Sequence, residues 1–234
     1  MKAWLALLIV SVFLSNCTTT TERTKSTEEV GGELCSVKVG GIEFTRSLND
    51  AKGAANVEGD KLTLASPAKR DYFNEPDGKM AISNAPVLLS KIDNTQPFTF
   101  QAKVSPTFTD TYDAGAVYIY QHTKRWFKFA FERDERKKTR IVTVRTTETS
   151  DDNNHDVVDS ASVFMKISSD VKTIGFYYSL DKENWQLVRL FKNDFPKELW
   201  LGLSAQSPIG NGTSTAFEEC SLVKVSIKDF RMGN

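Results

Sequence analysis

Histidine and cysteine are scarce in this chain, with two histidines and three cysteines among 234 residues. Structural zinc sites are built from several cysteine and histidine ligands, so these counts leave little for one. No G-x-x-x-x-G-K-[ST], G-x-G-x-x-G or H-E-x-x-H run occurs, and no serine lies within G-x-S-x-G. The sequence therefore argues against a nucleotide-binding loop, a zinc protease and a Ser-His-Asp hydrolase. It predicts neither a metal nor a cofactor.

Net charge is also lacking, because 30 lysines and arginines balance 30 aspartates and glutamates. No global field draws such a protein to a polyanion, so we expect no nucleic-acid partner. Asp152, Asn154 and Asp156 have the alternating spacing that opens a calcium loop. The sixth and twelfth positions are Val157 and Val163 instead of Gly and Glu, which favours a solvated loop over a metal site.

The chain has no hydrophobic run long enough to span a membrane as a helix. Its longest N-terminal run, Ala3–Leu14, has about 12 residues, too few for a hydrocarbon core of roughly 30 Å. Lys2 before it and small residues after it are typical of a secretory signal. Leu14-Ser15-Asn16-Cys17 resembles a bacterial lipobox, which implies cleavage before Cys17 and lipidation of that residue. An ordinary secreted protein is the alternative.

Residues 1–16 are thus predicted to be a lipoprotein signal peptide, and residues 17–33 a flexible tether. Thr18–Glu29, TTTTERTKSTEE, has no apolar residue with which to offset the entropy of ordering. Residues 34–234 are predicted to form one β-sandwich domain. We expect the protein in the cell envelope, lipid-anchored and at the outer membrane.

Aromatic residues are plentiful by contrast, with 15 Phe and 4 Trp. Residues 114–146 predict three consecutive antiparallel strands. In the middle strand Phe127, Phe129 and Phe131 fall on one face, while Trp126 and the polar residues Lys128 and Glu132 fall on the other. This period of two predicts a strand whose phenylalanine face lies in a core.

Four segments carry a resemblance to a known family. They are Tyr72-Phe-Asn-Glu-Pro76, Tyr112-Asp-Ala-Gly-Ala116, Trp126-Phe-Lys-Phe-Ala-Phe-Glu132 and Tyr178-Ser-Leu-Asp-Lys-Glu-Asn-Trp185. In this order they resemble the uncharacterised YesU-like, "regulation of enolase" family, over roughly residues 73–220. The resemblance implies an all-β, concanavalin A-like jelly-roll sandwich of two antiparallel sheets. It implies no established activity, although relatives associated with carbohydrate use favour a glycan ligand.

The outer face of the middle strand is the candidate binding surface. If residues 121–125 form a turn, Tyr120 lies opposite Trp126 and Tyr118 opposite Lys128. An aromatic platform flanked by charges suits a sugar, which has an apolar face and a rim of hydroxyls. The predicted carbohydrate-binding residues are Tyr118, Tyr120, Trp126, Lys128, Glu132 and Arg145. A plain solvated sheet surface is the alternative, and burial of Trp126 with no cavity beside it would contradict this platform.

Catalysis is less well supported than binding. The E-x-D-x-x-E strand motif of glucanases begins at Glu132 and Asp134, but Lys137 occupies the position of its last glutamate. The leading function is therefore non-catalytic binding of an oligo- or polysaccharide in support of polysaccharide use. A glycoside hydrolase or lyase with Glu132 as one catalytic residue is the first alternative. A structural or assembly lipoprotein that binds another protein is the second.

The resembled topology commonly places the first and last strands side by side. Cys35 and Cys220 lie in those predicted strands. An exported protein permits a disulfide, so a Cys35–Cys220 bridge is one expectation, and two buried free thiols are the other.

Overall fold

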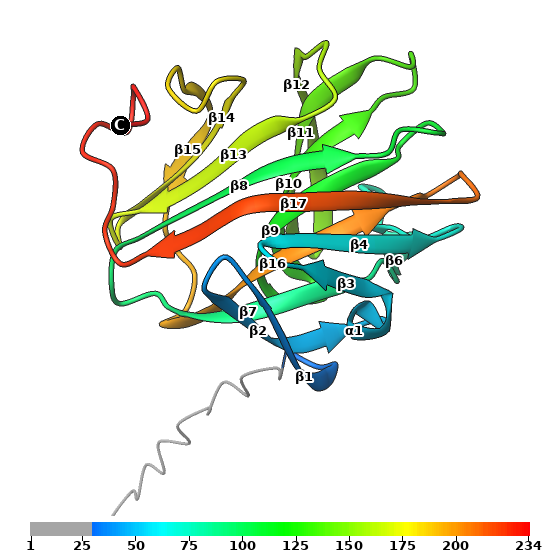
Figure 1. The fold of residues 1–234 in the computed structure, drawn as a ribbon, viewed down its shortest axis with the longest axis horizontal. Helices are drawn as coiled ribbons and strands as arrows, with labels where there is room; N and C mark the ends of the chain where they lie inside the picture. The colour runs from blue at the N-terminus through cyan, green and yellow to red at the C-terminus, as the bar shows by residue number, and fades with distance from the viewer. Residues whose placement is uncertain (1–29) are drawn as a thin grey trace, which may run out of the picture.

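The computed structural model describes residues 30–234; the predicted signal peptide, most of the tether and Cys17 lie outside the described residues. Two antiparallel sheets are stacked face to face (Figure 1). This arrangement confirms the predicted all-β jelly-roll sandwich of the concanavalin A type. Between residues 30 and 234 no helix is long and apolar enough to cross a membrane.

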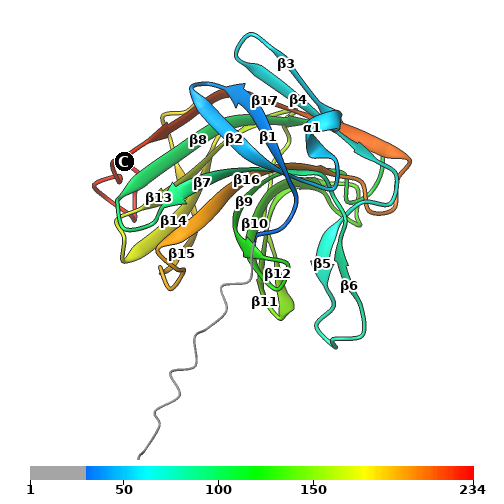
Figure 2. The same cartoon turned by 90° about the horizontal axis from the view of Figure 1, so that it is seen from below.

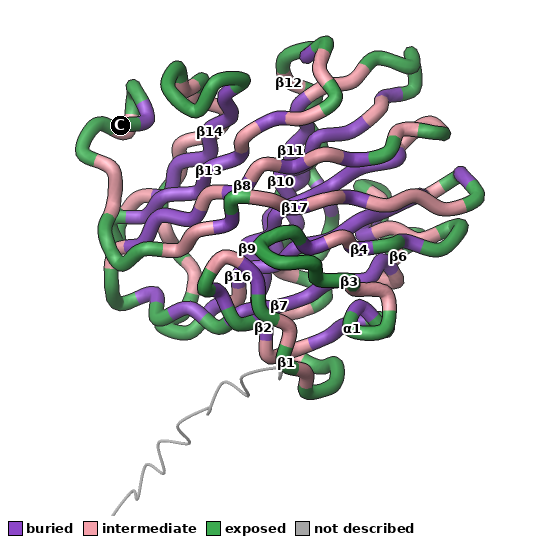
Figure 3. The backbone as a smooth tube through the Cα atoms, in the orientation of Figure 1, coloured by how far each residue is buried: buried purple, intermediate pink, exposed green. Residues whose placement is uncertain are grey.

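The first sheet has eight strands. In spatial order they are β1 (Glu33–Val39), β2 (Ile42–Leu48), β7 (Val87–Asp93), β16 (Glu198–Gln206), β9 (Ala114–His122), β10 (Arg125–Arg133), β11 (Thr139–Thr147) and β12 (Thr149–Val157). The predicted three-strand meander forms its β9–β10–β11 part. Figure 3 shows that buried residues follow these strands, whereas exposed residues concentrate in loops and along the edge strand β12.

The second sheet has seven strands and faces the first. In spatial order they are β15 (Gln186–Lys192), β14 (Thr173–Ser179), β13 (Val163–Ser169), β8 (Phe98–Pro106), β17 (Gly212–Val223), β4 (Lys61–Pro67) and β3 (Ala55–Glu58). The short helix α1 (Ala51–Ala54) leads into β3.

The core between the sheets is rich in phenylalanine. Phe127, Phe129 and Phe131 of β10 are each at most 1% exposed, as the alternating pattern predicted. The ring of Phe129 stacks on that of Phe176 from β14, with centroids 5.2 Å apart. Burial of each such side chain stabilises the fold by about 1.5–3 kcal/mol relative to exposure.

A two-stranded hairpin, β5 (Tyr72–Asn74) and β6 (Ala81–Ser83), lies on the other side of the eight-stranded sheet. Figure 2 shows it projecting on the same side of the molecule as β11 and β12. Side-chain amides of two asparagines hold the hairpin in place. Asn49 donates to the carbonyl of Ala85 at 2.7 Å, and Asn74 donates to the carbonyl of Glu148 at 2.8 Å. The backbone amide of Asn74 also donates to Ser150 Oγ at 2.9 Å. The hairpin therefore bridges from the end of β2 to the β11–β12 turn.

Ser150–Asp156, expected to be a solvated loop, is instead most of strand β12. Its polar residues pair with β11 along the edge of the sheet, with Asp152 opposite Val144 and Asn154 opposite Val142. A charged edge strand can form because neighbouring β11 supplies its hydrogen bonds, and the charge discourages pairing with other chains.

Candidate functional site

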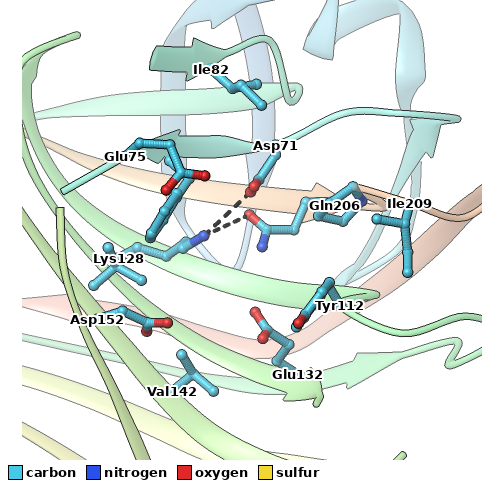
Figure 4. A pocket seen from close by; sticks show the side chains of 13 residues that line it. Asp71, Glu75, Ile82, Tyr112, Lys128, Glu132, Val142, Asp152, Gln206 and Ile209 are labelled. Atoms are coloured by element: carbon cyan, nitrogen blue, oxygen red, sulfur yellow. Dashed lines mark hydrogen bonds and ion pairs between the residues drawn. The ribbon is translucent and has the colours of Figure 1, made fainter. Parts of the chain in front are cut away.

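A pocket of about 350 Å³ opens on the outer face of the eight-stranded sheet, beside the β5–β6 hairpin. Its polar lining comes from Asp71, Glu75, Tyr112, Lys128, Glu132, Asp152 and Gln206 (Figure 4). Its apolar lining comes from Phe73, Ile82, Val142, Val144, Pro208 and Ile209. Every second side chain of each strand points to this face, because successive side chains of a strand point to opposite sides.

Lys128 lies in the floor of the pocket, with its side chain only 3% exposed. Its ammonium donates to the carbonyl of Tyr72 at 3.0 Å and to Gln206 Oε1 at 3.3 Å, and it lies 3.4 Å from Asp71 Oδ1. An ammonium has three protons to donate, so these acceptors satisfy it. A buried cation is tolerated only with such pairing, and Lys128 thereby fixes the end of β16 against the start of β5.

Glu132 lies on the same strand and face as Lys128 and is 7% exposed. Among residues 30–234 its carboxyl group has no hydrogen-bond partner, and it extends into the pocket in Figure 4. Burial raises the pKa of this carboxyl from 4.5 to about 8, although the charge of Lys128 opposes the shift. Glu132 is therefore largely protonated at neutral pH.

Asp152 enters the pocket from β12, across Val144 of β11. Although Asp152 is exposed on the edge strand, partial desolvation within the pocket raises the pKa of its carboxyl, and Lys128 again opposes the shift. Sequence reasoning missed this residue because it assigned the segment to a loop. Residues 150–156 are all polar, so no alternation with apolar residues marks them as a strand; in the structure Ser150, Asp152 and Asn154 pair with outward-facing residues of β11.

Tyr112 borders the pocket from the turn before β9, where its backbone is left-handed with φ of 67°. A non-glycine residue adopts this conformation at a cost, so the surrounding structure must hold it. Its amide donates to the carbonyl of Arg133 at 2.6 Å. Asp113 closes the same turn by accepting from the amides of Thr109 and Asp110 at 2.9 and 2.7 Å.

The aromatic platform predicted from the sequence is not an exposed surface. The expected register is confirmed, with Tyr120 opposite Trp126 and Tyr118 opposite Lys128. However, these three aromatic side chains are at most 1% exposed and do not line the pocket. Tyr72 of the hairpin covers them, with its ring centroid 5.9 Å from those of Tyr118 and Trp126 and 6.2 Å from that of Tyr120. The prediction of a sugar-stacking role for Trp126 and the tyrosines is corrected accordingly.

Arg145 does not share the pocket face either. It pairs with Phe127 across β10 and β11, so it lies on the face that looks toward the second sheet, and it is exposed at the edge. Of the predicted binding residues, the structure brings Lys128 and Glu132 together in the pocket. It adds Asp71, Glu75 and Gln206, which come from distant parts of the chain.

Asp134 has a structural role in the turn between β10 and β11. It accepts from the amides of Arg136 and Lys138 at 2.9 and 2.7 Å, and its other oxygen lies 2.7 Å from Nε of Arg140. These bonds hold the turn, and the residue does not line the pocket. The partial E-x-D motif thus contributes only Glu132 to the site.

The expected Cys35–Cys220 bridge is not formed, and both residues are free thiols. Their strands belong to different sheets, with β1 at the edge of one and β17 within the other. Cys220 lies against Gly40 in the β1–β2 turn, whereas Cys35 is roughly 15 Å further along β1 and lies 3.3 Å from the carbonyl of Phe44. Free thiols were the alternative expectation.

Solved structures share this architecture. A protein from Saccharomyces cerevisiae described as functionally unknown matches with a TM-score of 0.70 and 22% identity, over 78% of this chain and 96% of its own. The GH43 protein BlXynB of Bacillus licheniformis matches with a TM-score of 0.58 and 12% identity, over 74% of this chain. The Bacteroides ovatus xyloglucan PUL GH43B matches with a TM-score of 0.61 and 11% identity, over 82% of this chain. At these identities the likeness concerns the fold alone.

The chain spans only 35% and 38% of the lengths of the two GH43 proteins. No curated protein matches it. One family model matches residues 48–225, which include the seven-stranded sheet, strands β7, β16 and β9–β12 of the eight-stranded sheet, the hairpin and every residue that lines the pocket. The chain therefore belongs to the DUF1349 family, which is described as protein of unknown function.

Proposed function

We propose that this protein binds a carbohydrate, as one or two sugar residues, in the pocket on the outer face of its eight-stranded sheet, and does not cleave it. The observation that carries the proposal is the pocket itself: polar groups from five separate segments converge on a cavity with apolar walls. Its volume of about 350 Å³ is near the lower end of the range for ligand pockets.

The lining suits the two surfaces of a sugar ring. Phe73 and Ile82 are paired across the hairpin and together form an apolar wall. Such a wall can pack against the C–H face of a pyranose. Acidic side chains on the opposite side, with Glu132 and Asp152 among them, can form hydrogen bonds with hydroxyl groups. The family resemblance, with its association with carbohydrate use, agrees with this assignment.

Glycan-array binding tests the proposal directly. Phe73→Ala removes the aromatic wall, and we expect it to weaken binding at least tenfold for every glycan that the parent binds. Phe195→Ala is the matched control, because Phe195 is also a partly buried phenylalanine but does not line the pocket. Equal affinity of the parent and Phe73→Ala for all glycans would remove this pocket as the binding site.

We further infer, from the sequence alone, that the protein is a YesU-like lipoprotein held in the cell envelope by lipid on Cys17. The short apolar run and Leu14-Ser15-Asn16-Cys17 support this inference. Several acyl chains on one residue bind a bilayer stably. Cys17→Ser should move the protein from the membrane fraction to the soluble fraction, and retention in the membrane would exclude the anchor.

A glycoside-processing enzyme is the second candidate, and one observation favours it. Burial keeps Glu132 protonated near neutral pH, as a general acid must be, and Asp152 is a second carboxyl group in the same pocket. Release of reducing sugar by the parent and its loss in Glu132→Gln would establish this activity. Binding without release, over a panel of polysaccharides, would favour the binding function.

A further inference from the structure

The polar groups of the pocket are unevenly balanced between donors and acceptors. Lys128 is the only cation among the described residues that line it, and the carbonyl of Tyr72, Gln206 Oε1 and the carboxylate of Asp71 already engage its ammonium. It consequently has no proton left for a ligand. The groups that can meet a ligand are therefore mainly acceptors.

Three carboxyl groups remain after Lys128 and Asp71 are paired. Glu75, Glu132 and Asp152 line the pocket, and none forms an ion pair with another of the described residues. Arg140 lies opposite Glu132 in the strand register, but its guanidinium turns to Asp134 at 2.7 Å and to the carbonyl of His155 at 3.0 Å. Glu75 and Asp152 thus face the cavity with no cation other than the paired Lys128 among the described lining residues, and Glu132, largely protonated in the empty pocket, would ionise beside a bound cation, because an opposite charge lowers the pKa of a carboxyl group.

The buried end of the cavity points to a ligand rather than to a solvated acidic surface. Glu132 is more than nine-tenths buried, lacks a hydrogen-bond partner among residues 30–234, and extends into the cavity (Figure 4). Its carboxyl group is therefore open to a partner supplied by a ligand in the cavity. A cation is the partner that would favour the ionised form of Glu132 over the protonated one.

The cation that fits is not a metal ion. Within the described part of the chain, no three carboxylate, imidazole or thiol groups converge closely enough to hold one. The acids instead surround a space of ligand size whose wall, at Phe73 and Ile82, is apolar. Such a site matches a positive charge carried on an organic ring.

We propose that the pocket recognises a sugar unit that bears a free, protonated amino group, with Glu132 and Asp152 receiving the ammonium and Phe73 packing on the ring. The ligand class is therefore an N-unsubstituted amino sugar or a glycan that contains it, and uronic acids are excluded by charge. This specificity rests on the proposed carbohydrate-binding function and names its ligand.

Isothermal titration of the protein with matched disaccharides tests the specificity. The probes are the β-1,4 disaccharide of glucosamine, its N-acetylated form, cellobiose as the neutral counterpart, and glucuronic acid, with calcium chloride as a separate titrant. We expect the free-amine disaccharide to bind at least tenfold more tightly than the N-acetylated or neutral one. Glucuronic acid should show no binding.

Variants that replace a carboxyl group with an amide, which cannot ionise, locate the recognition. Glu132→Gln and Asp152→Asn should each reduce affinity for the free-amine disaccharide at least tenfold and bring it close to that for cellobiose. The control is Asp151→Asn, because Asp151 is adjacent to Asp152 on β12 but pairs with Arg145 on the opposite face. It removes the same charge and should leave the affinity unchanged. Thermal unfolding of each variant confirms that it is folded.

The outcomes separate this inference from the function on which it rests. Equal or tighter binding of cellobiose would overturn the amino-sugar specificity and leave carbohydrate binding intact. Calcium binding that disappears in Asp152→Asn would overturn it in favour of a metal site. An absence of binding for all of these sugars and across a glycan array would overturn the proposed function itself.

Discussion

The two faces of strand β10 are equally buried but differ in what they do. The face with Phe127, Phe129 and Phe131 packs against the second sheet, and these three side chains belong to the hydrophobic core. The face with Trp126, Lys128 and Glu132 is covered by a short hairpin, which seals the tryptophan but leaves a cavity beside the charged pair. Burial of apolar groups indicates only packing, whereas burial of ionisable groups beside a cavity marks the candidate site.

The largest expected effect concerns the inner face. Phe129→Ala removes a fully buried ring that stacks on Phe176, so we expect a loss of about 3–5 kcal/mol in the free energy of unfolding. Urea denaturation followed by circular dichroism measures it. Sugar binding by the fraction that remains folded should be unchanged, and a selective loss of binding would contradict the separation of the two faces.

Uncovering the outer face should cost somewhat less. Tyr72→Ala removes the ring that covers Tyr118, Tyr120 and Trp126, and we expect a loss of about 3 kcal/mol. It should also expose Trp126 to water and shift its fluorescence to longer wavelength. Making Tyr72→Ala in a protein that already carries Trp126→Phe shows whether the fluorescence shift comes from Trp126, because the shift should then be absent. An unchanged spectrum would mean that the hairpin is not what buries this face.

The pH dependence of stability sharpens the comparison further. Glu132 has a pKa of about 8 in the folded protein and of 4.5 when unperturbed, so between these values the folded state holds a proton that the unfolded state has lost. The contribution of the protonated Glu132 to the free energy of unfolding is fully present below pH 4.5 and is lost as the pH rises through 8. Relative to Glu132→Gln, the parent should lose roughly 3 kcal/mol between pH 4.5 and 7. Parallel stability curves for the two proteins would show that burial does not perturb this carboxyl.

The smallest effect is expected at Arg145. It is exposed and lies on the opposite face from Lys128, so Arg145→Ala should change the free energy of unfolding by less than about 0.5 kcal/mol. Affinity for any glycan that the parent binds should also remain unchanged. A loss of binding would mean that the ligand contacts Arg145 outside the pocket, as the sequence first predicted.

Sequence patterns were sufficient where neighbours are local in the chain. The alternation in residues 126–132 correctly separated the phenylalanines from Lys128 and Glu132. A turn at residues 121–125 gave the correct register with Tyr118 and Tyr120, although the strands extend to His122 and from Arg125. Both follow from the period of a strand and the geometry of a hairpin. The same reasoning could not tell that the aromatic side of this face is covered.

The remaining site residues depend on contacts between distant segments. Asp71 and Gln206 are brought to Lys128 by the hairpin and by β16, respectively, and Asp152 arrives on an edge strand whose polar sequence suggested a loop. No local pattern records such pairings, because the intervening chain can close loops of many lengths at similar entropic cost. Whether Cys35 and Cys220 form a bridge was left open for the same reason.

The resemblance to a known family indicated the all-β sandwich. The sequence by itself determined which side of β10 is phenylalanine-rich, and that Lys128 and Glu132 share the other side. These properties follow from residue type and a period of two along the chain. Only the tertiary structure decided that Tyr72 covers the aromatic residues and that carboxyl groups from separate segments surround an open pocket, because both depend on where the β5–β6 hairpin docks.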